Sequence, residues 1–385
     1  MSDVQRTPLA SVKDLIVLGE ALPFDVMDEF DRLLLASGQR IVSETQLEML
    51  LARGAWAHTH EVEALKERYK DQAPARSAVL RKESIFDLWE KKIWELDAVL
   101  RKVLAGQACA ADINALALRL AQLISRDTDV ALFMTIRQNE PRYALYALLH
   151  ALHTATIGMV LSRQLGWPIG QTASLLCASL TMDVSTLELQ ARMAQQQDPP
   201  STKQIDQIRA HPQASEQFLR TAGVQDEAWL VAVREHHERP DGTGYPSGLT
   251  EISELAHALR VTDVFTAKIS PRAFRPAMNL QAAAKQLFQD ERGGPIAAGL
   301  IKALGLYPPG DLVDLKSGEV GVVVRRGPSA TTPKVATLTN RQGKPVVETH
   351  VRDTSDPQFA VLGPHTERQS LTRVLPERVY GYIFA

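Results

Sequence analysis

The segment HHERPDGTGYP, from His236 to Pro246, is the strongest local signal in this chain of 385 residues. It ends an apolar helical pattern and continues into a turn that contains Pro240 and Gly242. Adjacent side chains on a helix point about 100° apart, so His236 and His237 can reach one ion only at a helix end or a bent turn. A histidine pair taken alone is more often a surface or capping feature than a metal site. The two histidines by themselves leave both interpretations open.

The whole string has the form HHE-x-x-DG-x-GYP and resembles the signature of the HD-GYP family. Members of that family are all-α, metal-dependent hydrolases that open cyclic di-GMP at a centre of two or three metal ions. The similarity extends over roughly residues 143 to 290, and the flanking segments look like the accessory domains of some members. The resemblance implies an HD-type helical bundle with a role in cyclic-di-GMP signalling.

Hydrophobic periodicity divides the chain into three parts. From Phe86 onward, apolar residues repeat at three- and four-residue steps to about residue 305, which is typical of amphipathic helices. Short apolar runs between Leu15 and Ile41 predict small strands, and β-branched alternation after Pro308 predicts a second group of strands. We therefore predict a mainly α fold, with a central all-α bundle between a small N-terminal α+β module and a small C-terminal β module. The expected boundaries are 1–60 for the N-terminal module, 61–82 for a linker or solvated helix, 83–306 for the helical domain and 307–385 for the β-rich module.

Composition argues against several other classes of protein. The formal net charge of -2, with 45% hydrophobic residues, provides no global attraction to nucleic acid or anionic lipid. Only two cysteines occur, Cys109 and Cys177, and their spacing indicates neither a disulfide framework nor a thiolate metal cluster. No N-terminal signal pattern is present, and no apolar run approaches the length of a membrane span. We expect a cytoplasmic protein with no nucleic-acid and no membrane partner.

Metal-ligating residue types are spaced about one helix and its connection apart, so a bundle can bring them to a common point. Histidine nitrogens and carboxylate oxygens suit iron or manganese. The ligands implied by the family resemblance are His150, Asp183, His211, His236, His237 and Asp263, with Asp183 also the catalytic candidate. His153, one turn after His150, is the alternative first histidine, and a packed core role is the alternative for a lone histidine on this apolar helix.

The resemblance also implies a substrate-binding element and a loop. Arg272 and Arg275, in SPRAFRP, lie where the family holds substrate phosphates, and arginine forks match phosphate oxygens well. The alternative for these two residues is a solvated basic loop. The loop of the signature is expected to shape the rim of the site and a surface for other signalling proteins; its residues are Glu238, Asp241, Gly242, Gly244, Tyr245 and Pro246.

The defining His-Asp pair of the family is incomplete in this sequence. The segment LTMDVST has Met182 where the histidine is expected and Thr186 where a lysine is expected. Tyr146, four residues before His150, stands where some members have a glutamate ligand. A methionine thioether is a soft ligand and a poor substitute for imidazole toward iron, manganese or magnesium. We therefore expect one divalent metal ion rather than two, or none, and slow or absent turnover.

Three functions stay open on the sequence. A degenerate HD-GYP protein that binds cyclic di-GMP, partner proteins or both is favoured, because the changes fall on the metal site while the loop and the arginines persist. The first alternative is an active metal-dependent cyclic-di-GMP phosphodiesterase, a phosphoric diester hydrolase. The second alternative is a protein-interaction scaffold with no nucleotide role.

Overall fold

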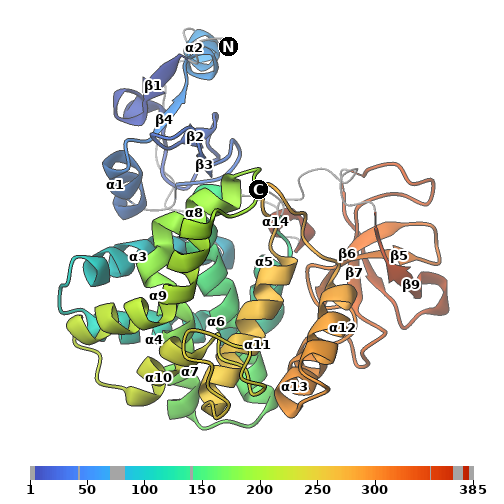
Figure 1. Cartoon of the computed structure of the whole chain (residues 1–385). Helices are drawn as coiled ribbons and strands as arrows, with labels where there is room; N and C mark the ends of the chain where they lie inside the picture. The colour runs from blue at the N-terminus through green and yellow to red at the C-terminus, as the bar shows by residue number, and fades with distance from the viewer. Residues whose placement is uncertain are drawn as a thin grey trace.

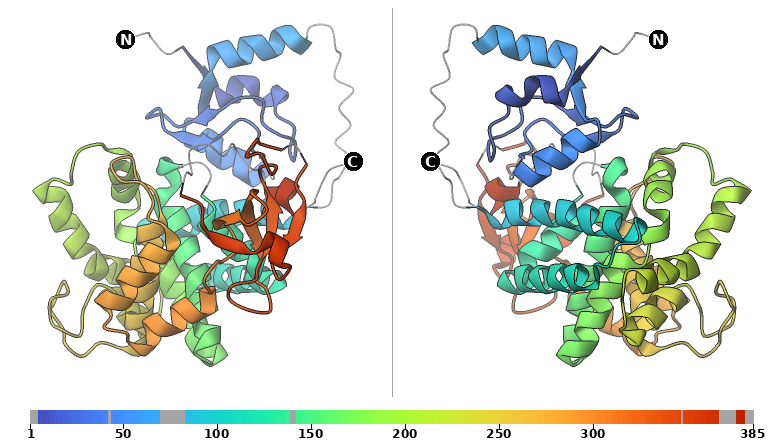
Figure 2. Two further views of the ribbon diagram at one scale, coloured as in Figure 1. Left: turned by 90° about the vertical axis from the view of Figure 1, so that its right-hand side faces the viewer. Right: turned by 90° about the vertical axis from the view of Figure 1, so that its left-hand side faces the viewer.

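The computed structural model describes residues 5–41, 44–69, 83–138, 142–346, 348–366 and 376–380. The described chain is mainly α-helical, with one small sheet toward each end. Figure 1 shows the N-terminal module, in blue, above the helices and the C-terminal sheet, in orange and red, at their side. Figure 2 shows the same arrangement from two further directions. The expected fold class is confirmed.

The N-terminal module is a four-stranded antiparallel sheet with two α-helices, in the strand order β1-β4-β2-β3. Its elements are β1 Arg6–Pro8, η1 Leu9–Leu15, β2 Val26–Met27, β3 Leu33–Leu35, α1 Glu44–Ala52, β4 Trp56–His58 and α2 Thr59–Tyr69. Strands β1 and β4 lie outside the segment in which the sequence predicts strands; at three residues each they are too short to show an alternation. Helix α2 covers the first part of the expected linker, up to Tyr69. Its Val62 and Leu65 are buried and it packs on β4 and β1, so this part of the chain is packed against the N-terminal sheet. Residues 70–82 of that linker lie outside the described residues.

The helical domain surrounds one central helix, α6. Its elements are α3 Ile85–Leu104, α4 Ala110–Arg126, α5 Thr128–Ile136, η2 Tyr143–Leu145, α6 Tyr146–Gln164, α7 Ile169–Thr181, η3 Val184–Thr186, α8 Leu187–Gln195, α9 Thr202–Thr221, α10 Glu227–Glu235, α11 Glu254–Ile269, α12 Leu280–Asp290 and α13 Pro295–Leu304. Helix α6 contacts α5, α7, α8, α11 and α13. Neighbours on several sides bury most of its residues, which explains its apolar composition.

The segment Tyr143–Gln164 has the length and mean hydropathy, 1.5, of a membrane-spanning helix. The expectation that no apolar run approaches a membrane span is therefore wrong for this segment. Its most apolar window is 94% buried inside the fold, as in the core helix of a globular domain. The hydropathy thus reflects packing against other helices.

Hydrogen bonds fix the first turn of α10 against α7, the two helices that precede His236 and Asp183. Asp226 caps α10 by accepting from Trp229 N at 3.1 Å, and its other oxygen accepts from Ser174 Oγ of α7 at 2.6 Å. The Trp229 indole donates to Thr181 Oγ1 at the end of α7, at 2.9 Å. Because the first turn of α10 is bonded to α7 at both Ser174 and Thr181, the two helices are held side by side.

The C-terminal module is a five-stranded antiparallel sheet in the order β8-β7-β6-β5-β9. Its elements are β5 Leu312–Leu315, β6 Val320–Arg325, β7 Lys334–Thr337, β8 Val351–Asp353, η4 Pro357–Phe359, β9 Val361–Pro364 and α14 Pro376–Val379. Leu312, Val322 and Val324 on one face pack with Phe133 of α5. Arg325 donates both terminal nitrogens to Asp127, at 2.8 and 2.7 Å, and so ties β6 to the start of α5.

Candidate metal centre

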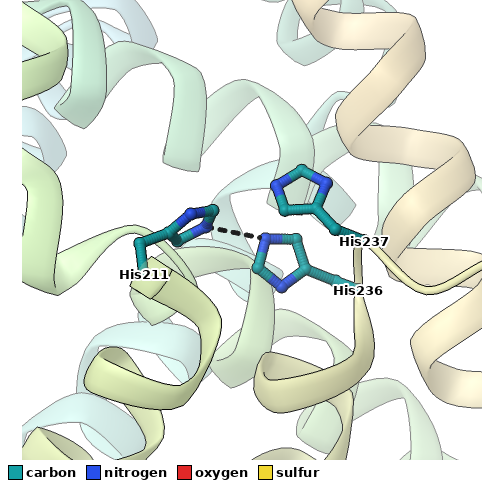
Figure 3. A group of neighbouring side chains, drawn as sticks. All are labelled: His211, His236 and His237. Atoms are coloured by element: carbon teal, nitrogen blue, oxygen red, sulfur yellow. Dashed lines mark hydrogen bonds between the residues drawn. The ribbon is translucent and has the colours of Figure 1, made fainter. Parts of the chain in front are cut away.

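Three histidines from two helices meet in the interior of the helical domain (Figure 3). His211 lies in the middle of α9, His236 follows the last residue of α10, and His237 comes next. One ligand nitrogen of each histidine lies within 4.8 Å of the others. Because α10 ends at Glu235, the adjacent histidines are released from helical geometry and both rings lie 5.0 Å from the His211 ring.

The ring orientations of His211 and His236 are set by backbone carbonyls. His211 Nδ1 lies 2.5 Å from the Ile208 oxygen, and His236 Nδ1 lies 2.7 Å from the Val233 oxygen. A carbonyl oxygen only accepts, so each Nδ1 carries a proton and donates it. The two Nε2 atoms are then left facing each other at 3.1 Å, and Asp183 Oδ1 lies 3.2 Å from His211 Nε2. Three acceptor atoms converge, and a cation is required to hold them together.

Both carbonyls are available for a local physical reason. Pro212 has no N–H, so the Ile208 carbonyl lacks the backbone donor that a helix normally supplies four residues on. The Val233 carbonyl lies in the last turn of α10, where helix carbonyls lose their partners. The residue types and spacing of the candidate ligands do not reveal either carbonyl. The proline was the signal that could have indicated the first of them.

A proton on His211 supplies the positive charge when no metal ion does. Burial lowers the pKa of His211, but the hydrogen bond and charge of Asp183, together with the Ile208 carbonyl, outweigh burial and raise the pKa overall. Burial raises the pKa of Asp183, but the hydrogen bond from His211 and the charges of the neighbouring histidines together lower it overall. Burial and the neighbouring His211 charge lower the pKa of His236 to about 4. The donor set therefore fits a divalent ion that displaces one proton from His211.

His150 and Asp263 form a second group beside these histidines. His150 Nε2 and Asp263 Oδ1 are 2.7 Å apart, while Asp263 Oδ2 lies 3.9 Å from His237 Nδ1. The His150 Nδ1 atom is buried and has no hydrogen-bond partner within the part of the chain that the structure describes. It therefore lacks the orienting acceptor that histidine ligands usually have. Since His150 and Asp263 already satisfy each other, this group supports a second ion less well than His211 and His236 support the first.

His153, the alternative first histidine, lies deeper in the helical core. Burial, together with the neighbouring His150, lowers its pKa to about 3, so it is neutral near pH 7. Its Nδ1 atom has no partner among residues 5–41, 44–69, 83–138, 142–346, 348–366 and 376–380. The structure thus brings His150, and not His153, into contact with Asp263.

Comparison with known proteins agrees with this arrangement. Residues 112–293 match the family model described as HD domain. A cyclic di-GMP phosphodiesterase of Pseudomonas aeruginosa is 29% identical over 213 residues, which are 54% of this chain and 51% of that protein. The central helical region therefore contains an HD domain.

Other similar proteins cover comparable parts of the chain. The cyclic di-GMP phosphodiesterase PdeB of Borreliella burgdorferi is 23% identical over 186 residues, 47% of this chain and 49% of that protein. The chain spans about half the length of these two curated relatives. A solved structure of an HDG"Y"P protein from Bdellovibrio bacteriovorus aligns with a TM-score of 0.49 and 17% identity, covering 78% of this chain and 99% of that chain.

Met182 and Thr186 of the HD domain contribute no imidazole and no charge to the site. Met182 is fully buried directly before Asp183, at the end of α7. Thr186 Oγ1 donates to the Asp183 carbonyl at 3.2 Å and accepts from Gln190 Nε2 at 3.4 Å. Both side chains are therefore part of the local packing around the cluster.

Arg272 and Arg275 of the HD domain lie on the segment after α11. Their backbones pair with each other, since Arg272 N donates to Arg275 O at 2.8 Å and Arg275 N donates to Arg272 O at 2.9 Å. The Arg272 side chain reaches Tyr146, whereas Arg275 Nη2 donates to the Ala267 carbonyl at 2.5 Å. Burial lowers the pKa of Arg272, but the contact with Tyr146 and, after it, the carboxylates of Asp263 and Asp183 raise the pKa overall. Arg272 therefore lies beside the cluster, within electrostatic reach of its carboxylates.

The signature loop packs beside the metal centre, where most of its polar side chains stabilise its own turns. Asp241 Oδ1 accepts from Thr243 N at 3.0 Å, and Gly242 has a φ of +72°, which favours glycine. A side chain at Gly244 would place a Cβ atom 2.4 Å from Arg239 N, so glycine is required there. The Tyr245 ring, followed by Pro246, stacks on His237 with ring centres 4.5 Å apart. Among these residues, Tyr245 is the one in ring contact with a candidate ligand.

Glu238 holds the loop closed from inside. It is fully buried, and its two carboxylate oxygens accept from Ser247 N at 2.7 Å and Leu249 N at 3.0 Å. Replacing Glu238 by alanine is expected to lower the free energy of unfolding by about 1–3 kcal/mol, because two backbone donors lose their acceptors. Urea unfolding measures the difference. Glu251→Ala, at an exposed position near the same loop, is the control and should change stability little; equal midpoints for the two variants would contradict the role given to Glu238.

Proposed function

We propose that this chain is a degenerate HD-GYP protein of cyclic-di-GMP signalling, which binds the nucleotide, partner proteins or both, with weak or absent hydrolysis. The observation that carries the proposal is the convergence of His211, His236 and Asp183 on one point that needs a cation. The names of the curated relatives support cyclic di-GMP as the ligand. A cytoplasmic location, which the cysteine usage supports, is part of the same proposal.

The residues that would hold a divalent ion are His211, His236, His237 and Asp183. Iron or manganese at such a site lowers the pKa of a bound water and neutralises phosphoryl oxygens. For the second group, His150 with Asp263, the buried Met182 occupies the position where the family resemblance expects an imidazole ligand. Loss of an electrostatic group such as the lysine expected at position 186 typically costs about 2.7–4 kcal/mol, or about 10²–10³ in rate. The arrangement therefore supports binding better than catalysis.

The decisive experiment combines elemental analysis, a turnover assay and calorimetry on the natural protein. We expect a single iron or manganese ion per chain, binding of cyclic di-GMP that weakens as salt is added, and hydrolysis close to background. Two bound ions with fast turnover would favour the active phosphodiesterase. Metal binding without any nucleotide binding would favour the scaffold, with the signature loop as the surface offered to partner proteins.

A further inference from the structure

The Arg272 side chain is held in one orientation by a single neutral group. Its Nε and Nη2 atoms donate to the Tyr146 hydroxyl oxygen at 3.1 and 2.9 Å. The guanidinium carbon also lies 4.8 Å from the centre of the Tyr146 ring. Two donors on one acceptor fix the plane of the guanidinium, so the direction of the remaining donors is set as well.

The positive charge of Arg272 has no direct counter-ion. Within the described ranges of the chain, no carboxylate oxygen lies within 4.0 Å of its guanidinium, and its Nη1 atom has no acceptor. A phenol accepts hydrogen bonds without cancelling charge. Asp183 and Asp263 act on Arg272 only from a greater distance. A partly buried cation with a free donor beside a candidate metal centre fits an anionic ligand.

Tyr146 is itself held firmly. It is the first residue of α6, it is 6% exposed, and it lies one turn before His150. The two rings are stacked, with centres 5.8 Å apart and planes 6° apart. The tyrosine therefore links the orientation of Arg272 to the helix that carries a candidate metal ligand.

We propose that Tyr146 is a positioning residue, which holds the Arg272 guanidinium with its charge uncompensated toward a phosphate oxygen of a bound cyclic dinucleotide. This inference rests on the proposed function. Each phosphodiester of such a ligand carries a negative charge, and the free Nη1 edge can donate to it. A carboxylate at position 146 would pair with Arg272 and cancel that charge. Tyrosine at position 146 therefore offers no carboxylate ligand to a metal ion, but it leaves the charge of Arg272 available to a phosphate.

The test is a double-mutant cycle of Tyr146→Phe and Arg272→Ala, with cyclic di-GMP affinity measured by calorimetry both in EDTA and with Mn²⁺. Tyr146→Phe keeps the ring stacked on His150 and removes only the acceptor. We expect roughly tenfold weaker binding from Tyr146→Phe, as for loss of a hydrogen bond to a charged group. In the Arg272→Ala background the same change should cost nothing further, since the tyrosine acts through the arginine.

Tyr143→Phe is the matched control. Tyr143 lies in η2, just before α6, is half-buried and makes no side-chain hydrogen bond with any residue that the structure describes. The Tyr143→Phe variant should bind cyclic di-GMP with the affinity of the natural protein. Thermal melting of every variant shows whether the fold is kept. A purely structural role for Tyr146 would lower the melting temperature and weaken binding to the same extent with and without Arg272.

The outcomes separate the inference from the proposed function. Unchanged affinity in Tyr146→Phe, or an equal loss in both backgrounds, overturns the positioning role while nucleotide binding stands. Absence of binding by the natural protein, in EDTA and in Mn²⁺, overturns both. Tyr146→Glu provides a second test should Tyr146→Phe not fold: in EDTA it should lose at least as much affinity as Arg272→Ala, and unchanged affinity in Tyr146→Glu overturns the inference.

Discussion

Replacing Met182 by histidine and Thr186 by lysine together is expected to raise cyclic-di-GMP hydrolysis at least about a hundredfold, because a metal ligand and an electrostatic donor return at once. The new imidazole would stand directly before Asp183, whose carboxylate is within electrostatic reach of His150. His150 and Asp263 now satisfy each other through one hydrogen bond. With a further ligand available, binding of a second metal ion can replace the hydrogen bond between His150 and Asp263. Each single change should help little, since residues that act as a unit are not additive.

Metal content and turnover of the double variant, both single variants and the natural protein measure this effect. Met182→Leu is the control, because it keeps the buried volume and adds no ligand. Both positions are buried, at 0% and 4% exposure, so the larger side chains must be accommodated, and melting temperatures report whether they are. A natural protein that already hydrolyses cyclic di-GMP as fast as the double variant would show that Met182 and Thr186 do not limit catalysis.

Alanine at His211 is expected to abolish stable metal binding. Loss of a group that merely orients a ligand costs about 10–100-fold in metal affinity, so loss of a central ligand should exceed about a hundredfold. His211 is the centre of the site, since its Nε2 atom faces both His236 and Asp183 at 3.1 and 3.2 Å. Elemental analysis after dialysis and a competition titration with a metal chelator give the magnitude.

His153→Leu is the matched control for this change. His153 is also a buried histidine of the helical domain, but it is neutral and its Nδ1 atom has no partner within the described chain, so leucine should leave metal affinity unchanged. Metal binding retained in His211→Ala and lost in His153→Leu would place the ion elsewhere in the bundle. Equal loss in both would indicate a general effect on folding, which melting curves would show.

Much of the site was predictable from residue types and their order. The string from His236 to Pro246 is long enough to identify the family, and Pro240 and Gly242 imply that the histidine pair lies at a helix end. Periodicity located the helices, because burial on one face leaves a direct mark on sequence. Strands β1 and β4 left no such mark at three residues each. They form because β4 pairs with both β1 and β2, which are distant in sequence.

The sequence by itself determined the family, the mainly α fold and the residue types available to a metal. Only the tertiary structure decided how those residues divide: His211, His236 and Asp183 converge without enough protons to satisfy one another, whereas His150 and Asp263 form a closed pair. It also decided that Tyr146, which stands where some family members have a glutamate ligand, binds the Arg272 side chain. The reason is that hydrogen-bond partners, tautomers and free charges depend on contacts between distant helices and on single backbone carbonyls, and neither leaves a pattern along one chain.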